Sequence, residues 1–306
     1  MNSAASMPHD TARQHVSGSA RYVDDIPTPQ GTLHLAFGLS PIAAGGLTSV
    51  ELSAVRAFDG VRLVLEAKDL PFTNDVSPSN NDEPLLATTT IHYAGQPIFL
   101  VVADSHHTAR KAARLAKIEI DETPPILTIE QAFKAGSRFE DGPRIYSKGD
   151  PGRALPKALN HLNGSLNVGG QEHFYLEGQA ALAIPGDQGD MVVYSSTQHP
   201  TEIQHKVSEA LNISQHAVRV EVRRMGGGFG GKESQGNALA VACALAAMIT
   251  GKPCKMRYDR DDDFIITGKR HDCRVDYQVG FDPLGRVEAL EFIHYFRCGW
   301  AQDLSL

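Results

Sequence analysis

The residues with the clearest capacity for chemistry form a glycine-rich run, Met225-Gly-Gly-Gly-Phe-Gly-Gly-Lys-Glu233, in which five of the six residues 226–231 are glycine. Glycine adopts positive φ without steric cost, so such a run can bring backbone N–H groups close to a ligand. The run lies between a strand-like segment and a long apolar helix, and a helix N-terminus at that place favours anions. One or two glycines would suffice for a plain turn, so the run indicates a binding loop.

The loop overlaps two phosphate-binding patterns, and neither is complete. Three of its glycines satisfy G-x-G-x-x-G, but Asp259, the nearest acid that could bind a ribose, follows Gly231 by 28 residues instead of about 20. The run also satisfies GxxxxGK, but Glu233 stands where a P-loop needs Ser or Thr to ligate Mg²⁺, and its carboxylate would repel phosphate. The third possibility is a loop that binds an organic anion through its backbone and presents Phe229 and Glu233 to a neighbouring substrate.

The elements that must position this loop fall into two groups along the chain. In the first group, hydrophobic patterning predicts strands at 32–39, 47–52, 61–65, 98–103 and 118–120. Its main helix is expected at 106–116, after the N-cap Ser105. The second group is predicted to contain strands at 171–176, 179–184, 191–195, 218–222, 255–258, 274–279 and 287–296, and helices at 201–211 and 234–249.

The segments outside these two groups carry turn-forming residues. Residues 123–165 are interrupted by Pro and Gly and are predicted to connect the two groups, with short helical pieces at 129–135 and 151–159. Residues 1–15 are small and polar and are predicted to form a flexible tail. Two polar groups are expected to be structural: Asp261–Asp263 as a solvated helix start, and Glu172 and His173 on opposite faces of a strand.

Composition excludes several classes of protein. The net charge of −7 gives no overall attraction to nucleic acid or to an anionic membrane. The four cysteines include no CxxC pair, which argues against a disulfide framework, a zinc ribbon or an iron–sulfur cluster built from this chain. The longest apolar stretch, 238–249, has about 12 residues against the roughly 20 that span a bilayer. With no leader-like start, a cytoplasmic location is expected.

Three motifs, in this order, closely resemble the molybdenum-binding large subunit of the xanthine dehydrogenase family. They are Gly169-Gly-Gln-Glu-His-Phe-Tyr-Leu-Glu177, Ser195-Ser-Thr-Gln-His199 and Arg224-Met-Gly-Gly-Gly-Phe-Gly-Gly-Lys-Glu233. The resemblance covers about residues 16–306 and is nearest to the bacterial two-chain type. That subunit is more than twice as long, so the chain is interpreted as its N-terminal part. The family's catalytic base would lie beyond residue 306, so no catalytic residue is assigned in this chain.

The resemblance implies an α+β fold. Residues 16–125 would form an α/β hammerhead domain, 126–144 a linker and 145–306 the first, incomplete part of a molybdopterin-binding α/β domain. The implied activity oxidises hypoxanthine to xanthine and xanthine to urate at a molybdenum–molybdopterin cofactor. A partner chain would carry two [2Fe-2S] clusters and FAD, with NAD as acceptor. The alternatives are another molybdenum hydroxylase, for a heteroaromatic compound or an aldehyde, and a non-catalytic assembly fragment.

Four positions carry roles over from the family. Gln198 matches a glutamine that hydrogen-bonds an oxygen ligand of molybdenum, and an amide can donate there without adding charge. Phe229 and Gly230 match the loop beside the cofactor, so that Gln198 and Phe229 are the residues expected nearest the metal. Glu233 matches the glutamate that binds the purine. Phe229 could also serve as a core plug. We expect Gln198 and Phe229 to share one pocket, with Glu233 at its rim.

Overall fold

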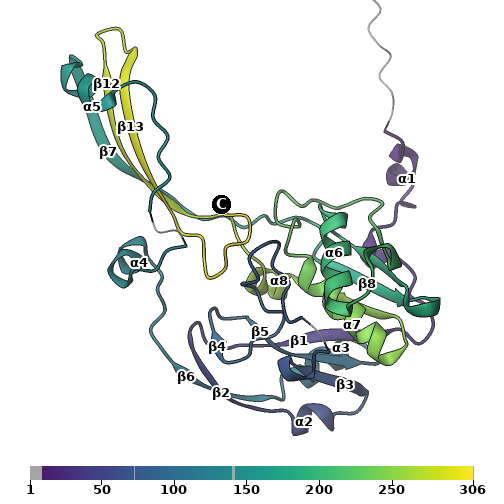
Figure 1. The fold of residues 1–306 in the computed structure, drawn as a ribbon. Helices are drawn as coiled ribbons and strands as arrows, with labels where there is room; N and C mark the ends of the chain where they lie inside the picture. The colour runs from purple at the N-terminus through teal and green to yellow at the C-terminus, as the bar shows by residue number, and fades with distance from the viewer. Residues whose placement is uncertain (1–8, 72, 140–141, 306) are drawn as a thin grey trace, which may run out of the picture.

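The computed structural model describes residues 9–71, 73–139 and 142–305 (Figure 1). The strands are β1 (Leu33–Leu39), β2 (Gly45–Glu51), β3 (Val61–Glu66), β4 (Thr90–Ile91), β5 (Pro97–Ala103), β6 (Lys117–Glu122), β7 (Asn160–Val168), β8 (Ala180–Pro185), β9 (Met191–Ser195), β10 (Val218–Glu221), β11 (Cys254–Arg257), β12 (Cys273–Phe281) and β13 (Val287–Phe296). The α-helices are α1 (Ala12–Val16), α2 (Ser53–Arg56), α3 (His106–Ala113), α4 (Ile129–Ala135), α5 (Pro151–Ala154), α6 (Pro200–Leu211), α7 (Asn237–Thr250) and α8 (Arg260–Ile266).

One seven-stranded sheet combines strands from both groups of the sequence, in the order β10-β9-β8-β11-β1-β5-β3. The two groups meet where β1 pairs in parallel with β11, with Leu33 opposite Cys254. Helices α6 and α7 pack on one face, where the apolar residues of α7 join Leu35, Leu100 and Val102 in a single core. Helix α3 packs on the other face, where its buried alanines contact a second core around Phe99 and Val101.

The N-terminal part carries a second, smaller sheet in the order β4-β2-β6. Ser105 caps α3 as predicted, since its side chain accepts a hydrogen bond from the Thr108 N–H at 3.1 Å. The short helix α4 and the strand β13 have the predicted bounds. Helix α1 lies almost entirely within the segment 1–15 that was predicted to be a tail, whose residues 1–8 are outside the described residues.

Strands β13, β12 and β7 form a third sheet that projects from the body of the molecule, and we call this sheet the arm (Figure 1). Strand register places alternate residues of all three strands on one face, which we call the arm face. There Tyr277 lies opposite Gly164 and Phe292, and most of its neighbours, apart from His294, are apolar. Seven large apolar residues of the arm face are exposed by 42% or more: Leu162, Leu166, Val168, Val287, Leu290, Phe292 and Phe296.

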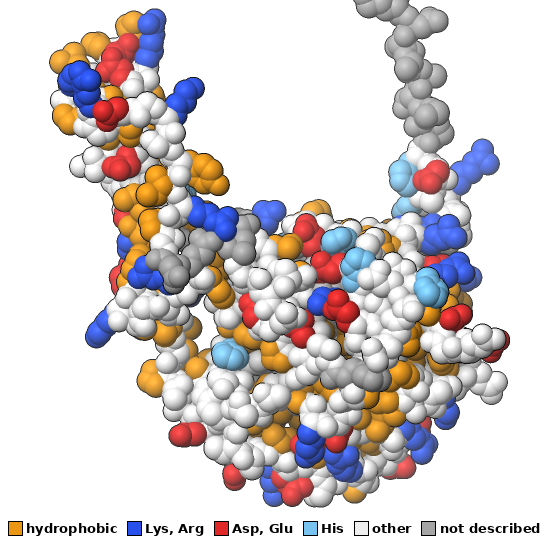
Figure 2. Space-filling model, viewed as in Figure 1, with side chains coloured by type: hydrophobic (Ala, Val, Ile, Leu, Met, Phe, Trp, Pro, Cys, Tyr) orange, Lys and Arg blue, Asp and Glu red, His pale blue; other side chains and the backbone are white. Residues whose placement is uncertain are grey.

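The arm has one apolar face that the described residues leave largely open, and Figure 2 shows hydrophobic side chains on the surface of the arm. On the opposite face Ala289 is buried, and Gly280 lies so close to Ala158 that an added Cβ would be 2.5 Å from the Ala158 Cβ. An antiparallel sheet normally buries one face and exposes a polar one. The arm therefore presents an apolar surface of the kind that usually has a partner.

Two predictions about this region were wrong. Strand β7 includes residues 160–165, which were predicted to belong to a connection, because its Asn, Ser and Gly residues suggest a loop and only pairing with β12 makes them a strand. Residues 171–176 were predicted to be a strand but form only one isolated bridge, between Gln171 and Arg270. No helix within 9–71, 73–139 and 142–305 combines the length and apolarity needed to cross a membrane.

Candidate functional site

The glycine-rich loop, residues 226–231, lies between β10 and α7. The backbone needs positive φ at Gly227 (97°) and Gly230 (94°), a conformation that glycine adopts freely. Helix α7 begins at Asn237, three residues later than predicted, so its N-terminus does not directly adjoin the loop. The N-cap residue is Gly236, which has no side chain to cap the helix, and the nearby Ser234 hydroxyl donates to the Asp303 carboxylate at 2.5 Å. The anion site at a helix end that the sequence suggested is therefore not formed in that way.

Gln198 lies against this loop, on the segment between β9 and α6. Its side-chain oxygen Oε1 accepts hydrogen bonds from the N–H groups of Gly230 at 2.9 Å and Lys232 at 3.2 Å. These two donors fix the amide orientation, because only its oxygen can accept. The amide nitrogen Nε2 has no hydrogen-bond partner among the described residues, and the side chain is exposed. Gln198 thus presents an uncharged donor beside the loop.

Gly228 must be glycine for this contact to form. A Cβ added there would lie 2.5 Å from Gln198 Oε1 and 2.8 Å from its Cδ, closer than real Cβ contacts come. Its φ is not in the left-handed region, so the requirement comes from space alone. The structure thus brings together Gln198 and the loop, which are about 30 residues apart in the sequence.

Phe229 forms the tip of the loop. The residue is 63% exposed, so the suggestion that Phe229 plugs the core is wrong. Its φ of 55° is unusual for a residue with a bulky side chain and costs about 1–3 kcal/mol. Strain and an exposed aromatic ring at one residue are typical of functional sites, and here both occur next to the Gln198 amide.

The segment from Gln171 to Glu177 wraps around the back of the loop. An added Cβ at Gly231 would lie 2.6 Å from the ring of His173, and one at Gly227 would lie 3.1 Å from the Cβ of Tyr175. Phe174, with φ of 49°, turns outward and is 66% exposed. These inward and outward turns replace the regular alternation of the predicted strand.

A buried polar network supports this segment. The Tyr175 hydroxyl donates to Asp263 Oδ1 at 2.7 Å and accepts from Gln179 Nε2 at 3.0 Å, and Gln179 also donates to the Gly231 carbonyl at 2.9 Å. Asp263 is 1% exposed, so the prediction that the whole acidic run 261–263 is solvated was wrong for this residue. Burial raises the pKa of Asp263, although the Tyr175 hydrogen bond opposes that effect.

Lys232 and Glu177 form a buried ion pair at the site. Glu177, with Glu172 and His173, was expected to be structural and not a metal ligand, and no role was predicted for Lys232. The Lys232 side chain is fully buried, with Nζ 3.1 Å from Glu177 Oε2 and 4.6 Å from the centre of the Tyr175 ring. Burial lowers the pKa of Lys232, and the Glu177 charge opposes this effect. The signal in the sequence was the position of Glu177 at the end of a run of polar and aromatic residues, but its partner follows 55 residues later.

Glu233 comes directly after Lys232 and is half-buried. Its carboxylate makes no hydrogen bond or ion pair with the described part of the chain, so it is available to a ligand. The nearby Asp303 carboxyl has a pKa that is raised mainly by burial, with smaller contributions from Glu202 and Glu233. A carboxylate without a protein partner, next to the loop, is compatible with binding an N–H donor.

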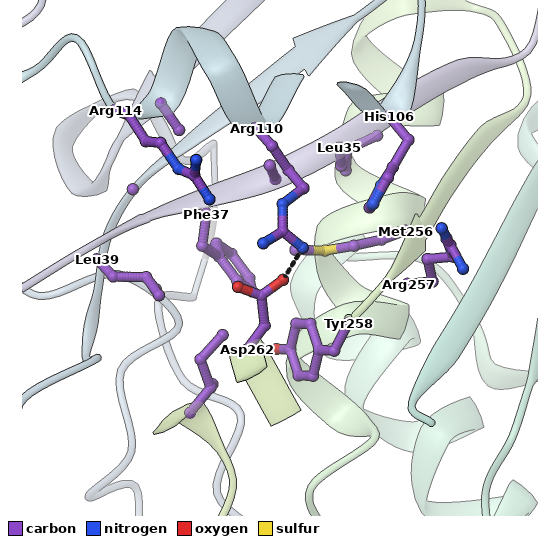
Figure 3. Close-up of a pocket in the computed structure, with 14 residues that line it drawn as sticks. Leu35, Phe37, Leu39, His106, Arg110, Arg114, Met256, Arg257, Tyr258 and Asp262 are labelled. Atoms are coloured by element: carbon purple, nitrogen blue, oxygen red, sulfur yellow. Dashed lines mark hydrogen bonds and ion pairs between the residues drawn. The ribbon is translucent and has the colours of Figure 1, made fainter. Parts of the chain in front are cut away.

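A cavity of about 190 Å³ lies elsewhere, where α3 and α8 meet across β1 and β11 (Figure 3). Arg110 crosses it and donates to Asp262 Oδ2 at 2.5 Å, and it also pairs with Asp259 and Asp261. These three carboxylates are close enough to hold a cation, but all three already pair with the Arg110 guanidinium. With Asp259 engaged in this way, the dinucleotide interpretation of the loop loses its ribose-binding acid.

Two family models match the chain. The aldehyde oxidase and xanthine dehydrogenase a/b hammerhead domain matches residues 17–124, and the molybdopterin cofactor-binding domain matches residues 138–306. Among relatives, the xanthine dehydrogenase of Drosophila subobscura is 40% identical over 299 residues, which are 97% of this chain and 22% of that protein. The xanthine dehydrogenase/oxidase of Mus musculus is 38% identical over 301 residues, 98% of this chain and 22% of that protein.

The two solved structures named below share the fold of this chain. The quinoline 2-oxidoreductase of Pseudomonas putida 86 superposes with a TM-score of 0.85 at 24% identity, covering 94% of this chain and 38% of that one. The aldehyde oxidoreductase of Desulfovibrio gigas gives a TM-score of 0.82 at 26% identity, covering 94% of this chain and 34% of that one. The chain therefore spans 22% of the curated relatives' length and less than two-fifths of these structures.

Proposed function

Because the chain belongs to the aldehyde oxidase and xanthine dehydrogenase family of molybdopterin-binding proteins, we propose that it forms part of the cofactor and substrate site of a xanthine dehydrogenase. The enzyme would oxidise hypoxanthine to xanthine and xanthine to urate. Electrons would pass through two [2Fe-2S] clusters and FAD on a partner chain to NAD, in the cytoplasm. The observation that carries the proposal is the Gln198 amide, whose oxygen is held by the glycine loop while its nitrogen remains free to donate.

The residues of the loop fit a molybdenum–molybdopterin cofactor. Such a cofactor presents oxygen atoms that accept hydrogen bonds, and the Gln198 amide supplies a matching donor without a charge. Gly228 lets that amide approach the loop, and Gly230 has space on its Cβ side, since only His173 lies within 4 Å. Gln198, Phe229 and Gly230 would hold the cofactor's metal end, and the bound cofactor would supply the oxidation chemistry.

The chain's own residues would then bind and orient the purine. Phe229 offers an exposed ring on which a flat heterocycle can pack. Glu233 offers a carboxylate that can accept a hydrogen bond from a ring N–H and so favour one tautomer and one orientation. A hydrogen bond to a charged group contributes about 1.5–3 kcal/mol, which is enough to discriminate between a purine and a substrate without ring nitrogens.

The proposal is tested on the complete enzyme as the source organism makes it. The gene for this chain would be tagged at its chromosomal position, and the complex purified and analysed for molybdenum, iron and flavin. We expect stoichiometric molybdenum and NAD reduction that depends on xanthine. A purified complex without molybdenum would overturn the cofactor assignment.

The same preparation separates the alternatives. Turnover of quinoline or of an aldehyde in preference to xanthine would indicate a different molybdenum hydroxylase. A chain that purifies alone, with no molybdenum and no partner, would indicate a non-catalytic fragment. The carboxylate of Glu233, which has no partner among the described residues, favours a purine over an aldehyde.

A further inference from the structure

We propose that Glu177 and Lys232 form a buried ion pair that holds both ends of the glycine loop and thereby positions Gln198 and Phe229. Glu177 and Lys232 are positioning residues in this scheme, because they act on the site through the loop. The inference rests on the proposed function only for what the loop binds. That the loop is held in this way is a property of the chain itself.

One carboxylate oxygen contacts both ends of the loop. Glu177 Oε2 accepts a hydrogen bond from the N–H of Gly226, the first loop residue, at 2.7 Å. The same oxygen lies 3.1 Å from Nζ of Lys232, the residue directly after the loop. The backbone adds a third connection, since the Glu177 N–H donates to the Gly226 carbonyl at 3.1 Å. The loop is therefore closed at its base by one residue of another segment.

Stability alone does not explain why these charges are buried. Lys232 is fully buried and Glu177 is 10% exposed, so both have lost most of their hydration. Replacing a buried ion pair with apolar residues of similar volume is often neutral or stabilising. An apolar pair, however, has no acceptor for the Gly226 N–H. The pair thus does something that apolar packing cannot, which is to fix the backbone at the start of the loop.

The backbone of Lys232 connects the pair to Gln198. The Lys232 carbonyl accepts from the Gln198 N–H at 2.8 Å and from the Thr197 hydroxyl at 3.1 Å. The Lys232 N–H donates to Gln198 Oε1 at 3.2 Å. A displacement of Lys232 would therefore move the amide on which the proposed cofactor site depends. Phe229 lies between the two fixed ends and would lose its orientation together with the loop.

The first experiment measures amide hydrogen exchange of loop peptides in the metal-free 306-residue chain. Glu177→Gln and Lys232→Met are compared with Lys206→Met, because Lys206 is another buried lysine whose ion-pair partners, Asp75 and Glu209, are not loop residues. We expect loop exchange to accelerate at least tenfold in the first two variants and to stay at the wild-type rate in Lys206→Met. Unchanged loop exchange in either folded variant, or equal acceleration in Lys206→Met, would overturn the proposal.

A double variant separates positioning from general stability. In Glu177→Met/Lys232→Met, both charges are replaced with apolar chains of similar length, so the melting temperature should recover relative to the single variants. Loop exchange should remain at least tenfold faster than in the wild type, because replacing Glu177 with methionine removes the acceptor for the Gly226 N–H. Recovery of loop protection together with the melting temperature would refute the positioning role. Should Lys232→Met fail to fold, this double variant and Glu177→Gln still decide the question.

Molybdenum content of the purified complex distinguishes this inference from the proposed function. In Lys232→Met we expect a loosened loop and at least a threefold loss of molybdenum. A loosened loop with full molybdenum content would support the ion pair and count against the loop as the cofactor site.

Discussion

Gly228→Ala offers a test of the contact between Gln198 and the loop. The new methyl group would lie 2.5 Å from Gln198 Oε1, so the exposed glutamine side chain must move away. Two hydrogen bonds, from the N–H groups of Gly230 and Lys232, are then lost. At about 1 kcal/mol for each bond, the loop loses about 2 kcal/mol of local protection. Since about 1.4 kcal/mol is tenfold in an equilibrium constant, these two amides should exchange roughly 30-fold faster.

The assay is amide hydrogen exchange followed residue by residue by NMR. Gly169→Ala is the matched control, because no atom lies within 4 Å of the position of its added Cβ and its φ is not positive. Gln198→Ala alone should produce the same acceleration at Gly230 and Lys232, and combining it with Gly228→Ala should add nothing further. Additive effects in the double variant, or wild-type exchange in Gly228→Ala, would refute the reasoning.

Three further predictions concern the substrate, the pH dependence of stability and the arm. In the complete enzyme, Glu233→Ala should lower kcat/KM for xanthine by one to two decades, since a charge-assisted hydrogen bond of about 1.5–3 kcal/mol is lost. Molybdenum content and aldehyde turnover should change little. An equal loss of kcat/KM for xanthine and for the aldehyde would count against a purine-binding role. Burial raises the pKa of Glu83 to about 8, so its contribution to stability is fully present below the ordinary pKa of a glutamate and is lost as pH rises through 8. The melting temperature should therefore fall between pH 5 and pH 9, and Glu83→Gln, but not the exposed Glu288→Gln, should reduce that fall. Replacing Leu166 and Phe292 on the arm face with threonine should lower the fluorescence of a bound hydrophobic dye without lowering the melting temperature, and unchanged fluorescence would show that the dye binds elsewhere.

Local sequence signals were sufficient to predict the strands of the main sheet and the helices that pack on it. The apolar run of β5 and the alanine-rich face of α3 predict their elements because patterning and capping act over a few residues. Strand β7 could not be predicted, because it becomes a strand only through its register with β12, more than 100 residues later. The single sheet shared by both groups of strands also depends on a distant pairing, between β1 and β11.

At the candidate site, too, local motifs could be predicted and contacts between distant segments could not. The motifs identified Gln198 and the loop, and the structure brings them into contact; the roles of Gln198, Phe229, Gly230 and Glu233 toward a cofactor and substrate stay predictions. The support behind the loop could not be predicted, because a lysine in a polar run gives no sign that Lys232 will be fully buried. Nor does the sequence show that Tyr175 turns inward to meet Asp263, 88 residues later.

The parallel pairing of β1 with β11 has a consequence during protein synthesis. Cys254 leaves the ribosome 221 residues after Leu33, its partner in the sheet. At about 5–20 residues per second, β1 waits roughly 10–40 s with one edge unpaired. An exposed edge strand is a template for pairing with other chains. In a cell that makes many copies from one messenger RNA, neighbouring nascent chains would carry the same open edge at the same time. Slow translation would therefore favour aggregation of these nascent chains. Chaperones that bind nascent chains would increase the yield of folded protein.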